Sequence, residues 1–307
     1  MRTQAEEQNL EDAHRFAKLS PVQEATDNGF LDEDPSTIDP QEPFGQPTPN
    51  NPPWNSAIAI AVWIASVLAI VIVPSIFLLP YVALQKPSLA ADQSLGEFLQ
   101  KDPTAIILQI VAIIPAHLLT ILLAWAIVTK LNRFSFKDTL GWQSGGMKGR
   151  HYILILVLFF AVAGVVGYYA PEQENDLTRM LRSSRAVVFL VAFMATFTAP
   201  IVEEVVYRGV LYSAFQRARG TGFAIAAVTL LFALVHVPQY YPSYSTIALL
   251  LLLSLILTSI RARTENLLPC IVLHTIFNGF QSVLLILEPY MKSSDQSVEQ
   301  SISLFLK

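Results

Sequence analysis

The stretch "SAIAIAVWIASVLAIVIVPSIFLLPYVAL", residues 56–84, contains no charged side chain. It is longer than the roughly 20 apolar residues that a helix needs to cross the hydrocarbon core of a bilayer. The whole chain agrees with this segment, because 53% of its 307 residues are hydrophobic and only 14% are charged, whereas soluble domains carry about 25% charged residues. We therefore expect an all-α polytopic membrane protein.

Apolar segments of this kind recur along the chain, at about 56–84, 105–129, 152–170, 186–215, 222–237, 245–260 and 267–287. Pro74 lies inside the first segment, and a proline inside a helix kinks it. The first segment has room for a helix plus a re-entrant or interfacial piece. The sequence therefore predicts seven or eight transmembrane helices.

Residues 1–53 differ in composition from the rest of the chain. They hold eleven acidic and three basic residues, together with eight of the nineteen prolines. Such a segment has too little apolar surface to offset the entropy lost on folding, and it lacks the pattern of a signal peptide. We expect a disordered acidic tail that acts as a spacer, with an acidic recruitment arm as the less favoured alternative. The expected regions after it are N-terminal transmembrane helices at 54–185, a catalytic region at 186–290 and a C-terminal tail at 291–307.

Basic residues in the connecting segments orient the helices. The 129–150 segment contains five basic residues and one acidic residue, and pairs of arginines follow the fourth and sixth apolar segments, namely Arg217, Arg219, Arg261 and Arg263. If the helices alternate in direction, these segments share one side, which the positive-inside rule assigns to the cytoplasm. The N-terminus is then also cytoplasmic. The expected location is the plasma membrane, or the inner membrane in a bacterium.

The fourth apolar segment contains "APIVEEVVYRGVLY", residues 199–212. Charged residues inside a membrane cost about 2.5–3.5 kcal/mol each on insertion scales and usually serve a function. Residues four apart share a helix face, so Glu204 is expected to pair with Arg208. Glu203 is rotated about 100° from Glu204 and has no basic partner on its own helix. We therefore interpret Glu204 as structural and Glu203 as the carboxyl available for chemistry.

Two further polar pairs have the same spacing. "FALVH" places Phe232 four residues before His236, and "HTIFN" places His274 four residues before Asn278. Glu203 and His236 each lie sixteen residues from the turn in "RARG", and antiparallel helices bring such positions side by side. The spacing allows one intramembrane active-site cluster of Glu203, His236, His274 and Asn278, supported by Glu204, Arg208 and Phe232.

Each of these features also has a purely structural interpretation. A lone histidine near the end of a span is usually interfacial, and a single polar pair can simply hold two helices together. Three such pairs in the C-terminal half favour function, because ionisable residues inside membranes are rare. His117 has no partner pattern and is interpreted as structural, and His14 and His151 as surface or interface residues. Cys270 is interpreted as a small buried side chain, with a thiol nucleophile as the less favoured alternative.

"EEVVYRG", "FALVH" and "HTIFN" resemble the three motifs of the CPBP family, the CAAX proteases and bacteriocin-processing enzymes. Its best-known members are the type II CAAX prenyl endopeptidases. The family pattern is Glu-Glu followed by three residues and Arg, then Phe with His four later, then His with Asn or Asp four later. All three motifs occur here in order, within about residues 186–287. Each motif alone is weak evidence, but the ordered set on apolar segments is specific.

The resemblance implies an intramembrane glutamic endopeptidase, a hydrolase without a cofactor. By this resemblance, Glu203 and His236 activate a water molecule. His274 and Asn278 stabilise the oxyanion, and the Glu204–Arg208 pair orients the site. The implied partners are the lipid bilayer and a hydrophobic or membrane-anchored peptide, which includes prenylated CAAX-type proteins. No basic patch for nucleic acid is found in the sequence.

Three alternatives rest on different chemistry. Glu203, His236 and His274 have the residue types of a three-ligand zinc site, although the His-Glu-x-x-His helix of common zinc proteases is absent. A non-catalytic scaffold or immunity protein has no need of a free glutamate. A transporter or channel is expected to spread its polar residues along a pore, whereas these gather in one cluster.

Overall fold

The computed structural model describes the backbone of residues 46–85 and 94–305, and the side chains of residues 46–85 and 94–289. Most of the expected acidic tail, and the side chains of the expected C-terminal tail, lie outside the described residues. Within the described residues, every regular element is a helix. This confirms the expected fold class.

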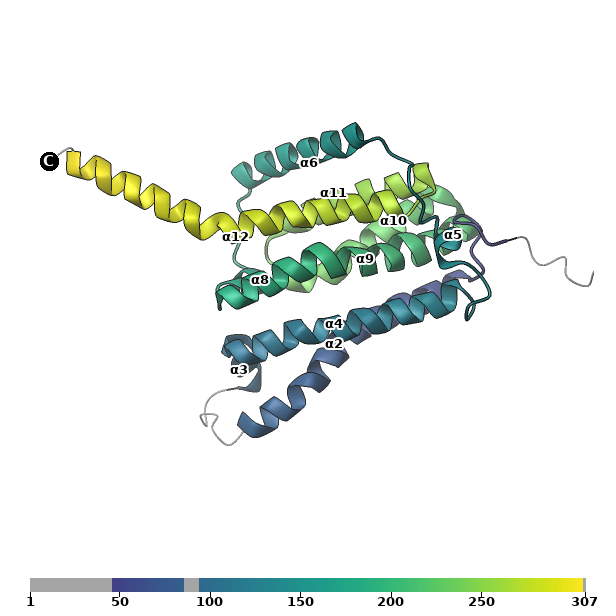
Figure 1. The fold of residues 1–307 in the computed structure, drawn as a ribbon, viewed down its shortest axis with the longest axis horizontal. Helices are drawn as coiled ribbons and strands as arrows, with labels where there is room; N and C mark the ends of the chain where they lie inside the picture. The colour runs from purple at the N-terminus through teal and green to yellow at the C-terminus, as the bar shows by residue number, and fades with distance from the viewer. Residues whose placement is uncertain (1–45, 86–93, 306–307) are drawn as a thin grey trace, which may run out of the picture. The chain divides into compact units, whose positions relative to one another are not determined.

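The elements follow one another along the chain in the colour order of Figure 1. Two of them, η2 and η3, are π-helices. Their bounds are α2 (Ser56–Gln85), α3 (Leu95–Lys101), α4 (Pro103–Val128), α5 (Phe136–Leu140), α6 (Gly149–Tyr169), α7 (Asp176–Leu181), α8 (Arg185–Phe193), η2 (Met194–Thr198), α9 (Ala199–Glu204), η3 (Val205–Leu211), α10 (Tyr212–Tyr240), α11 (Tyr244–Thr264) and α12 (Leu268–Phe305).

Six helical stretches in the described part of the chain are long and apolar enough to cross a membrane. One of them, Arg185–Tyr240, has 56 residues and would extend about 84 Å at 1.5 Å per residue. It is not one straight crossing, because Gly220 interrupts it with non-helical angles of φ 81° and ψ 169°. The Tyr207 and Phe232 ring centroids lie 5.1 Å apart, so the chain folds back at Gly220. The expected fourth and fifth segments are therefore both present, and the first segment is the single helix α2.

The described helices pack in pairs. α2 lies along α4, α10 lies along α11, and α12 packs against α8, η2 and α11, whereas α6 contacts α11 at the edge of the assembly (Figure 1). Asp102 joins the first pair, since its side chain caps α4 at the backbone N–H of Ala105 and accepts a hydrogen bond from the Tyr81 hydroxyl of α2. Pro103 at the first position of α4 has no N–H to leave unsatisfied.

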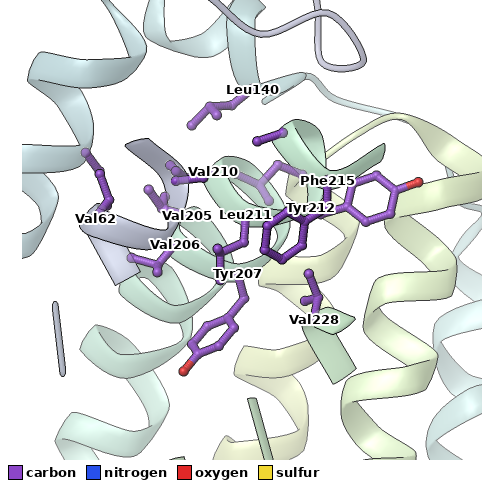
Figure 2. Close-up of a cluster of buried hydrophobic side chains, with 14 of the residues drawn as sticks. Val62, Leu140, Val205, Val206, Tyr207, Val210, Leu211, Tyr212, Phe215 and Val228 are labelled. Carbon is purple, nitrogen blue, oxygen red and sulfur yellow. The ribbon is translucent and has the colours of Figure 1, made fainter. Parts of the chain in front are cut away.

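The largest buried apolar cluster surrounds η3. Figure 2 shows that η3 side chains Val205, Val206, Val210 and Leu211 pack between residues of α2, α5 and α10. The cluster also includes Trp54 from the segment before α2, whose indole N–H donates to the Val210 carbonyl at 3.0 Å. The core is therefore built around the segment that follows the two glutamates.

The basic connecting segments meet at one end of the helices. The Leu267 backbone N–H donates to the Gly141 carbonyl at 2.9 Å, which joins the 264–268 and 129–149 connections. Arg217 donates to the Trp54 carbonyl at 2.8 Å, which brings the start of α2 to the same end. This arrangement agrees with helices that alternate in direction. That the shared end faces the cytoplasm stays a prediction.

The sequence placed Arg261 in the connection after the sixth apolar segment, whereas the structure makes it a fully buried member of α11. Its guanidinium donates to the Arg208 carbonyl at 3.1 Å, the Pro49 carbonyl at 3.1 Å and the Ser213 hydroxyl at 3.2 Å. A charge with this many hydrogen-bond partners is tolerated in the interior, so Arg261 ties the segment before α2 to the region of η3.

Candidate active site

Glu204 and Arg208 form the buried base of the site. Arg208 Nη1 lies 2.9 Å from Glu204 Oε1, and both side chains are completely buried. The ion pair expected from the four-residue spacing is therefore confirmed. The other guanidinium nitrogens donate to Ser254 and Thr258 of α11, and the guanidinium carbon lies 4.7 Å from the centroid of the Phe232 ring. Every nitrogen of Arg208 is used, so this residue is fixed in place.

Glu203 has a different environment from its neighbour. Its side chain is 24% exposed, against 0% for Glu204, and no lysine or arginine in the described residues forms an ion pair with it. The nearest basic atom is His274 Nε2, which lies 3.7 Å from Glu203 Oε2. The expected difference between the two glutamates is present. The imidazole beside Glu203, however, belongs to α12, whereas the sequence placed His236 of α10 in that position.

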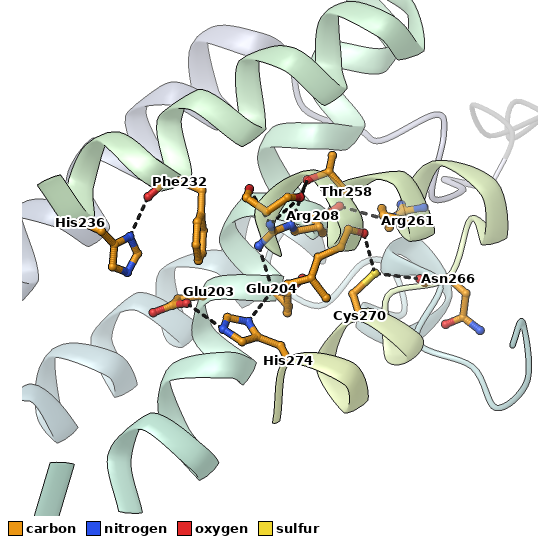
Figure 3. A network of polar contacts seen from close by, with 12 residues as sticks. Glu203, Glu204, Arg208, Phe232, His236, Thr258, Arg261, Asn266, Cys270 and His274 are labelled. Atoms are coloured by element: carbon orange, nitrogen blue, oxygen red, sulfur yellow. Dashed lines mark hydrogen bonds and ion pairs between the residues drawn. The ribbon is translucent and has the colours of Figure 1, made fainter. Parts of the chain in front are cut away.

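His274 links the two glutamates, as Figure 3 shows. Its Nδ1 lies 2.8 Å from Glu204 Oε1, and its Nε2 is the atom that faces Glu203. Since a carboxylate can only accept, Nδ1 carries a proton that it donates to Glu204. The ring is therefore held in one orientation by the Glu204–Arg208 pair, and Nε2 is presented to the neighbouring carboxyl.

His236 faces the same space from α10. Its Nδ1 lies 2.7 Å from the Phe232 carbonyl, so Nδ1 is the donor and Nε2 of the neutral ring is an acceptor. The Phe232 ring lies between two imidazoles, with centroid distances of 4.7 Å to His236 and 6.1 Å to His274. The expected packing of Phe232 on His236 is confirmed. In Figure 3 the His236 ring and the Glu203 carboxyl lie toward the same space beside Phe232.

Asn278 is oriented by an irregularity in the helix that carries the glutamates. In η2 the Ala199 N–H bonds to the Met194 carbonyl, five residues back, and the next residue, Pro200, has no N–H. The Ala195 carbonyl accepts instead from Asn278 Nδ2, at 2.8 Å. The second N–H of the amide is left for another acceptor. Short π-helical turns are frequent at functional sites, and here two of them flank α9, which carries Glu203 and Glu204.

One cavity, about 1410 Å³ in volume, brings the candidate residues together. Its walls include Glu203, Phe232, His236, His274 and Asn278. Much of the rest is apolar and comes from α2, α4 and α8, with a polar group near the start of α7 and α8 that includes Glu172, Glu174, Arg182 and Arg185. The cavity thus offers apolar walls and a charged rim to a ligand, and a carboxyl, two imidazoles and an amide to its reactive part.

Two residues outside the expected cluster need separate comment. Cys270 is fully buried, and its thiol contacts the Leu257 carbonyl at 3.4 Å rather than the cavity, as expected for a small buried side chain. His117 of α4 lines the cavity, with its Nδ1 3.1 Å from the Thr198 hydroxyl. Sequence reasoning missed its place on the cavity wall because no local pattern links His117 to the other polar pairs.

The described residues contain no group of three His, Cys, Asp or Glu side chains placed to hold a metal ion. Glu203 and His274 are close, but together with His236 they form no such group. The geometry therefore gives no support to the alternative of a zinc site on Glu203, His236 and His274. Metal analysis of the purified protein remains the direct test.

The fold and the site define a class of protein: a multi-pass helical membrane protein with a polar, carboxyl-containing centre inside its helices. Residues 185–280 match a family model described as Rce1-like, type II CAAX prenyl endopeptidase Rce1-like. The match contains all three motifs and confirms the resemblance to the CPBP and CAAX proteases. It points to a membrane endopeptidase. Comparisons with curated proteins and with solved structures found no match.

Proposed function

We propose that this protein is an intramembrane endopeptidase that hydrolyses a peptide bond with a water molecule activated by Glu203. The observation that carries the proposal is the contrast between two adjacent carboxyls at one cavity. Glu204 is buried and paired with Arg208, whereas Glu203 is partly exposed and lines the cavity. A structural pair needs only one acid, so the second acid is available as a general base.

The proposed reaction follows from the positions of the polar groups. Glu203 takes a proton from water while the water oxygen attacks the peptide carbonyl carbon, and the His236 ring, which faces the same space, limits the positions that this water can take. The oxyanion receives hydrogen bonds from the second N–H of Asn278 and, in its doubly protonated form, from His274 Nε2. When the C–N bond breaks, the proton held by Glu203 passes to the leaving amine. Each fixed donor to an oxyanion contributes about 2.7–4 kcal/mol in well-studied cases.

The proposed substrate is a hydrophobic or membrane-anchored peptide, with prenylated CAAX-type proteins as the leading class. The apolar walls from α2, α4 and α8 suit a lipid-like or apolar chain, and the charged rim suits the polar end of a peptide. The family match supports the same class.

The test compares the peptide termini of membranes that contain the wild-type protein with those of membranes that contain Glu203→Ala at equal abundance. We expect new termini in the wild-type membranes that are missing from the variant. A second assay uses an internally quenched farnesylated CAAX peptide with the purified protein, with and without a chelator. Identical termini in both membranes would favour a scaffold function, and loss of cleavage on chelation would favour the zinc alternative.

A further inference from the structure

His117 is a third imidazole at the cavity, and it comes from a helix outside the family match. It lies near the middle of α4, is 7% exposed and lines the same cavity as Glu203. α4 packs against α9, the helix that carries Glu203. A histidine in such a position costs free energy in an apolar helix unless its polar atoms are used.

The hydrogen bonds around His117 decide which of its nitrogens carries the proton. The Thr198 hydroxyl donates to the Met194 carbonyl at 3.2 Å. That hydroxyl has a single proton, so toward His117 Nδ1, at 3.1 Å, it acts as the acceptor. Nδ1 therefore carries a proton, and Nε2 of the neutral ring is left as a basic nitrogen.

The support for His117 also comes from the irregular helix of the site. Thr198 is the last residue of η2 and immediately precedes α9. Asn278 bonds to Ala195 in the same π-helix. The turn that orients the amide on one wall of the cavity thus orients His117 on another.

From these contacts we infer that His117 is a catalytic residue of the peptidase, in addition to the family motifs. Its Nε2 accepts a hydrogen bond from the attacking water, whose other proton is donated to the Glu203 carboxylate. As the C–O bond forms, one water proton moves to Glu203 and passes later to the leaving amine, and His117 holds the other throughout. The inference rests on the proposed function and adds a residue of α4 to the proposed catalytic residues.

Two substitutions of His117 distinguish a catalytic role from a packing role. Each replaces the imidazole by an amide that lies near only one of the two ring nitrogens, Nδ1 or Nε2. His117→Asn retains an amide N–H near the position of Nδ1 and its bond to Thr198, but has no group at the position of Nε2. His117→Gln places a non-basic amide near Nε2 and loses the bond to Thr198. Thr198→Val also loses that bond and leaves the imidazole intact.

The rates are measured with the full-length protein and the quenched farnesylated peptide, and with Glu203-dependent termini in membranes as a second readout. We expect His117→Asn to lower kcat by about 100-fold with KM changed less than about twofold, because the attacking water is no longer held in its reactive position. Thr198→Val should lower kcat by less than about fivefold, and His117→Gln should be about tenfold slower than Thr198→Val.

A packing role predicts a different order, with His117→Asn close to wild type and His117→Gln equal to Thr198→Val. Wild-type kcat in His117→Asn, or equal rates of His117→Gln and Thr198→Val, overturns the inference about His117 and leaves the proposed function intact. The second comparison holds even if His117→Asn fails to fold. If the wild-type protein shows no cleavage that depends on Glu203, the proposed function fails, and the inference fails with it.

Discussion

Glu203 and Glu204 are neighbours in the sequence, yet they occupy different environments. The four-residue spacing to Arg208 gives Glu204 a buried partner, and the rotation of one residue directs Glu203 to the cavity. An isolated ionised carboxylate is expensive to bury, whereas a paired and hydrogen-bonded one is tolerated. The same chemical group therefore has a structural role at one position and a proposed catalytic role at the next.

The first prediction at the residue scale concerns stability. Glu204→Gln leaves the Arg208 guanidinium buried without its counter-charge, and breaking a buried pair in this way costs about 3–5 kcal/mol. Glu203→Gln changes a partly exposed carboxyl that pairs with no arginine among the described residues and should cost less than about 1 kcal/mol. Thermal unfolding of the purified variants in detergent measures the difference. Equal unfolding temperatures for Glu204→Gln and the wild type would contradict the buried pair.

A second residue-scale prediction concerns the only cysteine. Cys270 is fully buried and points to the carbonyls of Leu257 and Asn266, and buried cysteines of this kind are chemically inert. Cys270→Ala should therefore keep the cleavage rate within about twofold of wild type. A complete loss of cleavage in a folded Cys270→Ala protein would instead support the alternative in which the Cys270 thiol is the nucleophile.

Pairs within one helix could be predicted at this scale, and contacts between helices could not. The Glu204–Arg208 and Phe232–His236 contacts follow from the four-residue repeat alone. The contact of His274 with Glu204 depends on the rotation of α12 against α9, which no periodicity in the sequence reports. His117 was missed for the same reason, since its partner Thr198 lies 81 positions later.

At the scale of elements, the two π-helices around α9 determine how the site is held. They alter the backbone hydrogen bonding, and side chains from other segments bond to carbonyls of these turns: Asn278 to Ala195, Arg261 to Arg208 and Trp54 to Val210. The four-residue spacing of the motif residues predicts one α-helix through the whole stretch. The partners of these carbonyls lie on segments far away in the sequence, so propensity and hydrophobic pattern did not reveal the π-helical turns.

A prediction at this scale concerns the close contact of Gly141 with Glu265 and Pro49, where the connection before α6 meets the connection between α11 and α12. Gly141 has a φ of +67°, and a Cβ there would clash with the Glu265 carbonyl and lie 2.8 Å from Pro49 Cγ. Gly141→Ala should therefore destabilise the protein by about 1–3 kcal/mol. The matched control is Gly96→Ala in α3, where a Cβ meets no atom within 4 Å and should be neutral or slightly stabilising. Unfolding in detergent compares them, and equal stability of the two variants would contradict the close junction.

At the scale of the whole molecule, the fold class followed directly from composition and apolar segment length. The six long apolar stretches in the described residues, one of them folded back at Gly220, contain all seven expected segments. Orientation in the membrane is set by the basic residues that flank the helices. The clustering of the basic connections at one end supports the cytoplasmic assignment as a prediction.

Labelling with a membrane-impermeant thiol reagent tests this orientation. Lys137→Cys and Gln173→Cys place exposed thiols on connections at opposite ends of α6, and the buried Cys270 serves as the unlabelled background in the wild-type protein. We expect Gln173→Cys to react in intact cells and Lys137→Cys to react only after the membrane is opened. The reverse pattern would invert the assigned orientation.

If Glu203 is the base of a hydrolytic site, the kcat of Glu203→Gln must differ from that of wild type when both are measured at equal abundance. Glutamine keeps the size of the side chain and removes its basicity. We expect kcat to fall by at least about 100-fold while the unfolding temperature stays near that of wild type. A folded Glu203→Gln protein that cleaves at the wild-type rate would contradict the claim.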